Sequence, residues 1–247
     1  MCRHLAYLGP PVGLDALLLS PEHSLLHQSH APRHQSHGRM NADGFGAGWY
    51  DHTVRAEPAR YRSARPMWSD ASFASLARLV RAEALLAAVR SASPGMPVEE
   101  TGAAPFTHGR WLFSHNGLVD DFHGDAGVAL RRTLGDRGSA ALLGHCDSEV
   151  LFALTLARLD AGAEPGEALA SVVGDVLAVG PARLNLLLTD GHRIAATACG
   201  DTLVVRQHPG DAVVVASEPF DDDPGWEPVP DASLVRATPT SVTVTPL

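Results

Sequence analysis

From Leu184 onward, the chain consists of short apolar or β-branched runs that are separated by turn residues. The turns contain Asp-Gly, Gly-Asp or Pro-Gly pairs, which are typical of tight connections between neighbouring strands. This pattern predicts a meander of antiparallel strands, so any fold of the chain has to include an antiparallel sheet. The predicted strands cover residues 184–190, 193–199, 202–207, 212–217 and 241–245.

The earlier part of the chain alternates between predicted strands and predicted helices. Apolar runs bounded by turn residues predict the strands, and apolar residues three or four positions apart predict the helices. Asp70 is a predicted helix N-cap, and the His- and Ser-rich stretch 23–38 is predicted to be a loop. Strands at both ends with helical pairs between them indicate a mixed α and β layered domain. The predicted strands are 2–8, 46–50, 53–62, 85–90 and 111–113, and the predicted helices are 12–19, 71–82, 126–135, 147–161 and 165–179.

Lysine is absent from the 247 residues, so all 19 basic side chains are arginines. This excludes chemistry that needs a lysine amine, such as Schiff-base aldolases, pyridoxal enzymes and the lysine-bearing phosphate loop. A formal net charge of −9 argues against nucleic acid as a partner and against binding to a membrane surface. Because 45% of the residues are hydrophobic, the chain has enough apolar side chains to form a buried core.

The cysteine count indicates the compartment. Cys2, Cys146 and Cys199 are too few for a disulfide scaffold. An odd number of cysteines without an export signal is typical of a reduced, cytoplasmic protein. No run of about 20 apolar residues is present, so we expect no transmembrane helix.

Cys2 is a candidate nucleophile because it directly follows the initiator methionine. Removal of Met1 would leave a thiol and a free α-amine on one residue. An α-amine has a pKa of about 7.7–8.0 and a thiol one of about 8.5, so the amine can accept the thiol proton near neutral pH. Such a residue supplies both nucleophile and general base. The alternative is that Cys2 is only a small apolar strand residue.

The sequence SHNG at residues 114–117 is a candidate oxyanion-binding element at the end of a predicted strand. Asn116 offers a side-chain NH2 group, and Gly117 lets its backbone N–H approach a ligand closely because it lacks a Cβ atom. The alternative is a simple Asn-Gly turn.

Two charged residues are candidate substrate ligands. Arg90 ends an otherwise apolar predicted strand, where its charge needs a partner. That partner is either a substrate carboxylate or a structural acidic side chain. Asp147 lies at a predicted helix start, where it either binds a substrate ammonium group or caps the helix.

Histidines at spacings of three or four from His23 to His37 raise the possibility of a metal site. Pro32 interrupts a continuous helix, and no HExxH pattern is present, so we expect loop histidines rather than a metal. Trp68 lies in a polar loop and either packs in the core or lines a pocket.

Five motifs occur in a fixed order: MCRHLAYLG at the N-terminus, NADGFGAGWY at 41–50, VRSAS at 89–93, SHNG at 114–117 and CDSE at 146–149. Together they resemble the class II glutamine amidotransferase domain, an N-terminal-nucleophile hydrolase. The opening motif and the stretches from QSHAPRHQSHGRM to YRSARPMWSD are most similar to the ergothioneine-biosynthesis γ-glutamyl hydrolases. The resemblance spans essentially the whole chain and is strongest over residues 2–150.

The resemblance implies an α+β fold, a four-layer αββα sandwich, formed as a single domain over residues 2–247. It implies that Cys2 is the nucleophile and its freed amine the base, so a chain that keeps Met1 should be inactive. The oxyanion hole is then formed by Asn116 and Gly117. The remaining implied roles are substrate binding: Arg90 to an α-carboxylate, Asp147 to an α-ammonium group, and Ser93 where the wider class usually has threonine. The expected site needs no metal and no cofactor.

The implied activity is hydrolysis of the small-molecule amide γ-glutamyl-hercynylcysteine sulfoxide to glutamate and hercynylcysteine sulfoxide. One alternative is a glutaminase subunit that supplies ammonia to a separate synthase. The other is a non-catalytic metal-binding or small-ligand-binding protein built on the histidines of residues 23–37. Candidates for contacting the leaving group are Trp68, Asp70 and Tyr50, chosen by loop position alone.

Overall fold

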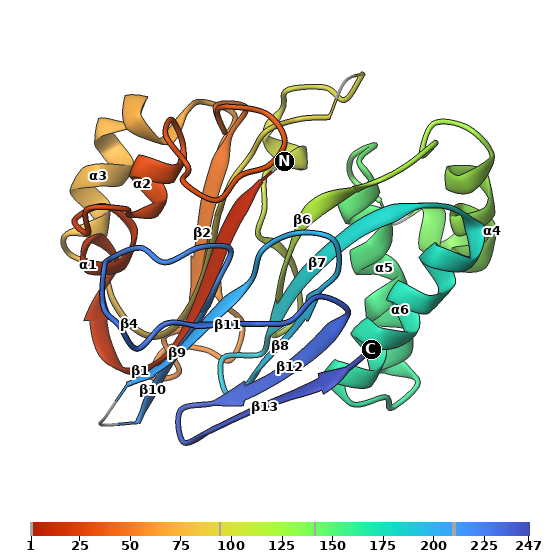
Figure 1. Cartoon of the computed structure of the whole chain (residues 1–247). Helices are drawn as coiled ribbons and strands as arrows, with labels where there is room; N and C mark the ends of the chain where they lie inside the picture. The colour runs from red at the N-terminus through yellow and green to blue at the C-terminus, as the bar shows by residue number, and fades with distance from the viewer. Residues whose placement is uncertain (1, 94, 141, 209–210) are drawn as a thin grey trace.

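The computed structural model describes residues 2–93, 95–140, 142–208 and 211–247. Two antiparallel sheets lie face to face, with one group of helices on each outer side (Figure 1). The predicted α+β, four-layer αββα sandwich is therefore confirmed. Within the described residues, no helix is both long and apolar enough to span a bilayer.

The first sheet has seven strands and contains the N-terminal strand near its centre. The alternation of side chains along β1 explains this position: Leu5 and Tyr7 pack toward the outer helices, whereas Ala6 and Leu8 pack toward the second sheet. The strands are β1 (Arg3–Gly13), β2 (Phe45–Trp49), β3 (Ala59–Ser63), β4 (Arg81–Val89), β9 (Val204–His208), β10 (Ala212–Ala216) and β11 (Glu227–Pro228), in the order β11-β9-β10-β1-β4-β2-β3.

The second sheet has six strands and packs closely on the first. The glycines of β2 allow this approach: a Cβ atom at Gly48 would lie 2.7 Å from the methyl groups of Leu112, and one at Gly46 would lie 2.5 Å from the carbonyl oxygen of Ala104. The strands are β5 (Phe106–His108), β6 (Trp111–Val119), β7 (Ala182–Thr189), β8 (Ile194–Ala198), β12 (Ser233–Thr238) and β13 (Ser241–Pro246), in the order β13-β12-β8-β7-β6-β5.

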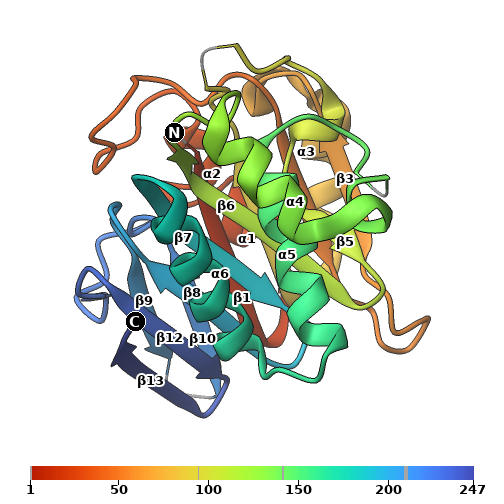
Figure 2. The ribbon, with the colours of Figure 1, turned by 90° about the vertical axis from the view of Figure 1, so that its right-hand side faces the viewer.

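The helices cover the two outer faces, as the view in Figure 2 shows for the second sheet. Each outer face has its own apolar core, and a third core lies between the sheets. The helices on the first sheet are α1 (Leu14–Leu18), α2 (Leu25–Gln28) and α3 (Ala71–Ala77), and those on the second are α4 (Asp125–Ala140), α5 (Asp147–Asp160) and α6 (Pro165–Val179). Two short 3-10 turns are η1 (Met67–Ser69) and η2 (Glu100–Gly102).

Four predictions about local structure were wrong. The predicted strand 53–62 begins only at Ala59, as β3. The C-terminal strands do not form one meander, because β9 and β10 join the first sheet while β7, β8, β12 and β13 join the second. The predicted helix 71–82 ends at Ala77, and Arg81 already begins β4. The predicted loop 23–38 contains the short helix α2, in which the Ser24 side chain accepts a hydrogen bond from the His27 N–H as an N-cap.

Candidate active site

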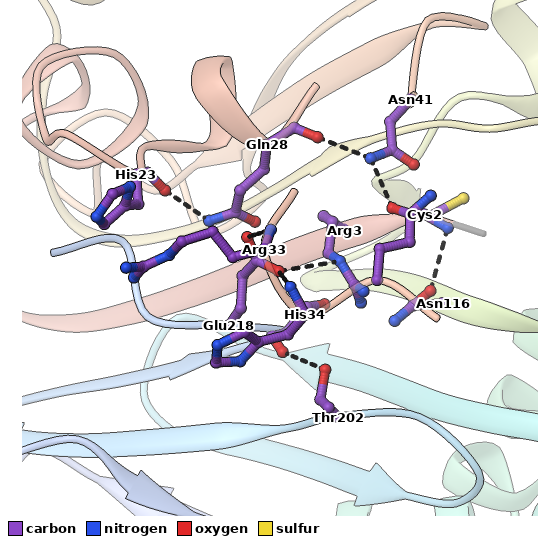
Figure 3. A network of polar contacts seen from close by, with 12 residues as sticks. Cys2, Arg3, His23, Gln28, Arg33, His34, Asn41, Asn116, Thr202 and Glu218 are labelled. Atoms are coloured by element: carbon purple, nitrogen blue, oxygen red, sulfur yellow. Dashed lines mark hydrogen bonds and ion pairs between the residues drawn. The ribbon is translucent and has the colours of Figure 1, made fainter. Parts of the chain in front are cut away.

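One pocket gathers most of the predicted site residues, which lie directly before β1, after β4, within β6 and at the start of α5. Cys2, Arg90, Ser93, Gly117 and Asp147 all line it. The sixth predicted residue, Asn116, is fully buried beside Cys2 (Figure 3). The structure therefore brings together residues that are up to 145 positions apart in the sequence.

Asn116 is joined directly to Cys2. The backbone N–H of Cys2 donates a hydrogen bond of 3.1 Å to Asn116 Oδ1. Asn116 Nδ2 is buried and has no hydrogen-bond partner among the described residues. A buried amide donor without a partner is unusual, so the nucleophile has an unused N–H donor beside it. The predicted removal of Met1 concerns a residue outside the described part of the chain.

The alternative interpretation of residues 116–117 as an Asn-Gly turn was wrong. Both residues lie inside β6, paired with Asn185 and Leu184 of β7. Glycine is required for packing, since a Cβ atom at Gly117 would lie 1.9 Å from the carbonyl oxygen of Arg183. The same lack of a side chain leaves the backbone of Gly117 exposed to the pocket.

Arg90 is a largely buried cation with no acidic partner among the described residues. Its Nη1 donates to the carbonyl oxygen of Asp43 at 3.4 Å, and its Nη2 donates to the carbonyl oxygen of Pro97 at 3.0 Å. These carbonyls hold the guanidinium in place but do not neutralise it. The structural ion pair that the sequence left open is thus not formed, and the charge faces the pocket unpaired.

Asp147 is the first residue of α5 and connects this helix to β6. Its Oδ1 accepts a 2.7 Å hydrogen bond from the Ser148 N–H, and its Oδ2 accepts one of 3.2 Å from the Val119 N–H. The N-cap residue of α5 is Cys146, so Asp147 is not the helix cap that the sequence left open. Asp147 also lies 4.0 Å from Nδ1 of His115, which accepts or donates a hydrogen bond with Ser148 Oγ at 3.1 Å.

The pocket contains a second thiol, that of Cys146. Burial, followed by the charge of Asp147, raises the pKa of this thiol to about 12. Because the thiolate is the nucleophilic form, Cys146 stays protonated and unreactive near neutral pH. Cys2 is therefore the candidate nucleophile of this pocket.

Sequence reasoning missed a buried ion pair next to the nucleophile. Arg3 and Glu218 are both fully buried, with 3.6 Å between Arg3 Nε and Glu218 Oε2. The two oxygens of Glu218 accept hydrogen bonds from the backbone N–H groups of Arg33 and His34, at 3.0 and 2.7 Å (Figure 3). The only signal in the sequence was a charged residue within an apolar strand, which does not identify its partner.

The histidines of residues 23–37 do not form one cluster of metal ligands. The rings of His23, His27 and His30 pack in a row, with centroids 5.7 and 5.1 Å apart, and His30 then contacts Trp68. Ligand atoms of Glu22, His23 and Asp222 lie within 4.8 Å of one another. However, Asp222 already pairs with the guanidinium of Arg33, a cation that a metal ion would have to displace.

The three candidates for leaving-group contact lie away from this pocket. Trp68 and Asp70 line a separate hollow beside His30. The suggestion of Tyr50 was wrong: its side chain is buried at the other end of β2, where its hydroxyl donates to the carbonyl oxygens of Arg110 and Thr189. The Tyr50 hydroxyl therefore has a structural role, in which it links backbone segments of the second sheet.

Comparison with known proteins shows the family to which this chain belongs. The model of the class II glutamine amidotransferases matches residues 22–218. The chain belongs to this family, as the motifs predicted.

Curated relatives include two proteins named γ-glutamyl-hercynylcysteine sulfoxide hydrolase. The one from Mycolicibacterium smegmatis is 48% identical over 248 residues, and the alignment covers 100% of this chain and 100% of the relative. The one from Mycobacterium tuberculosis strain CDC 1551 is 46% identical over 249 residues, with 100% of this chain and 97% of the relative covered. A solved structure of a class II glutamine aminotransferase domain protein from Silicibacter pomeroyi has a TM-score of 0.69 and 26% identity, with 99% of both chains covered.

Proposed function

We propose that this protein hydrolyses the γ-glutamyl amide bond of γ-glutamyl-hercynylcysteine sulfoxide to give glutamate and hercynylcysteine sulfoxide. The full-length relatives carry this activity in their names. The observation that carries the proposal is the unpaired guanidinium of Arg90 in the pocket that Cys2 and Asp147 also line. A γ-glutamyl group presents an α-carboxylate, an α-ammonium group and a scissile amide, so its charges complement these side chains.

The proposal includes a covalent mechanism at Cys2. With Met1 removed, the free α-amine takes the thiol proton and the thiolate attacks the Cδ carbonyl carbon. The negative charge that forms on the carbonyl oxygen is stabilised by Asn116 Nδ2 and the Gly117 N–H. The C–N bond then breaks, and the α-ammonium group returns its proton to the leaving amine. A water molecule, deprotonated by the same amine, hydrolyses the thioester to glutamate and free thiol.

Substrate binding is assigned to three side chains. Arg90 holds the α-carboxylate, Asp147 the α-ammonium group, and the Ser93 hydroxyl donates or accepts a further hydrogen bond. These charges complete the site without a metal or cofactor. The proposal also takes residues 2–247 as a single domain and places the reaction in the cytoplasm, in keeping with three free cysteines among the described residues.

A comparison of substrates tests the function. We expect kcat/KM for γ-glutamyl-hercynylcysteine sulfoxide to exceed that for free glutamine by at least about tenfold, because leaving-group contacts add transition-state binding. The control is Cys2→Ala, which removes turnover of both substrates while circular dichroism and the melting temperature stay unchanged. A preference for glutamine would instead identify a glutaminase that supplies ammonia.

A further inference from the structure

The pocket accounts for the glutamyl half of the substrate but leaves the other half without a binding residue. The segment of residues 31–40, which we call the arginine loop, approaches Ser91 of the pocket wall at Gly38. It contains Arg33 and Arg39 and no Asp or Glu, in a chain with a net charge of −9. Its charge is therefore opposite to that of the protein as a whole.

The arginine loop is held at both ends by buried polar groups. Glu218, whose charge is balanced by Arg3, accepts hydrogen bonds from the backbone N–H groups of Arg33 and His34. Directly after the other end, the Asn41 N–H donates to the carbonyl oxygen of Ser29 at 2.7 Å, and Asn41 Nδ2 donates to the side-chain oxygen of Gln35 at 2.9 Å. Such anchoring fixes an exposed loop in one place, as a binding element requires.

The end of the loop runs along the wall of the pocket. The Asp43 N–H donates to the carbonyl oxygen of Arg90 at 2.9 Å, and the Ala92 N–H donates to Asp43 Oδ2 at 2.8 Å. A Cβ atom at Gly38 would lie 3.9 Å from Ser91 Oγ. The carbonyl oxygen of Ser91, in turn, lies 3.9 Å from Sγ of Cys2. Gly38 and Asp43 thus contact residues 90–92 of the pocket wall, beside the thiol of Cys2.

The two arginines of the loop differ in their partners. Arg33 pairs with Asp222 at 3.1 Å, and its guanidinium points away from Cys2 (Figure 3). Arg39 is exposed and has no ion pair or hydrogen-bond partner for its side chain within the described ranges. Arg39 directly follows Gly38, which approaches Ser91 of the pocket wall, and no acidic side chain of the described residues balances its exposed guanidinium.

We propose that Arg39 determines specificity by binding a carboxylate of the leaving group. This inference rests on the proposed function. In a γ-glutamyl amide of a cysteine derivative, the scissile nitrogen is the cysteine α-nitrogen, so a carboxylate lies one carbon away from it. The guanidinium of Arg39, one residue after Gly38 at the pocket wall, matches this anion in charge and in its planar pair of acceptors.

Two substrates that differ by that carboxylate test the proposal. One is γ-glutamyl-S-methylcysteine sulfoxide, and the other is its decarboxylated counterpart, the γ-glutamyl amide of 2-(methylsulfinyl)ethylamine. For Arg39→Met we expect KM to rise about tenfold with the first substrate and kcat to stay the same, as for a loss of uniform binding. With the second substrate we expect no change. The matched control is Arg33→Met, in the same loop, which should leave both substrates unaffected.

Each outcome bears on a different claim. Equal effects of Arg39→Met on both substrates, or no effect on either, would overturn the role of Arg39 while leaving γ-glutamyl hydrolysis intact. A wild-type enzyme that does not distinguish the two substrates would also overturn it. Hydrolysis of neither substrate by the wild-type enzyme would overturn this inference, and a failure to hydrolyse γ-glutamyl-hercynylcysteine sulfoxide as well would contradict the proposed function itself.

Discussion

At the scale of single residues, β1 begins directly after Cys2 and buries two side chains that can carry a positive charge, Arg3 and His4. Arg3 faces the outer helices and is balanced by Glu218. His4 faces the second sheet, where its Nδ1 lies 3.0 Å from Ser114 Oγ. Burial, together with the charges of His115 and Arg3, lowers the pKa of His4 to about 3. A neutral His4 is therefore part of the folded state at all moderate pH values.

The pKa of His4 predicts that acid destabilises the fold. Its ordinary value is about 6.5, so between pH 6.5 and 3 the unfolded chain binds a proton that the folded chain does not. Stability must therefore fall as the pH falls through this window. Between pH 7 and 5 we expect the free energy of unfolding to drop by about 2 kcal/mol more in the wild type than in His4→Asn. Urea unfolding of both proteins at the two pH values measures this, and equal drops would contradict it.

At the scale of elements, the turn η2 packs closely against the guanidinium of Arg90. Gly102, the last residue of η2, leaves room for it: a Cβ atom at Gly102 would lie 2.6 Å from Arg90 Nη2. The element thus sets the place of a side chain that is 12 residues away in sequence.

The variant Gly102→Ala should displace the Arg90 guanidinium without unfolding the protein, because the end of a long side chain can shift. We expect KM for γ-glutamyl substrates to rise about tenfold with little change in kcat. The control is Gly174→Ala in α6, where a Cβ atom meets nothing within 4 Å and alanine favours the helix. Steady-state kinetics of both variants provide the measurement. An unchanged KM for Gly102→Ala would show that Arg90 does not bind the substrate.

The sequence predicted the type of most elements but not all of their ends or partners. Val150, Leu151 and Leu154 are buried in α5 as their spacing indicated. Leu79 fits the periodicity of the preceding helix equally well, yet it is 81% exposed, because the chain leaves the helix at Ala77 to enter β4. Periodicity reports local preference, whereas the pairing of β4 with β1 and β2 is a tertiary interaction that overrides it.

At the scale of the whole molecule, three of the four layers meet at the pocket. The first sheet contributes Cys2, directly before β1, and the end of β4, the second sheet contributes β6, and the outer helices on that sheet contribute the start of α5. Spacing along the chain cannot show that Cys2, Asn116 and Asp147 meet. The order of the motifs indicated that these residues meet, because it resembles the order in a known family. The orientation of the Asn116 amide and the hydrogen bonds of Glu218 to the arginine loop could be found only from the structure.

The central claim is that Cys2 forms a covalent bond with a γ-glutamyl group, and intact mass spectrometry tests it most directly. The mass of the purified protein is measured before and after incubation with a glutamine-analogue diazoketone. We predict a mass without Met1 and a single adduct that is absent from Cys2→Ala. An adduct that persists in Cys2→Ala, or no adduct on protein that has lost Met1, would contradict the account.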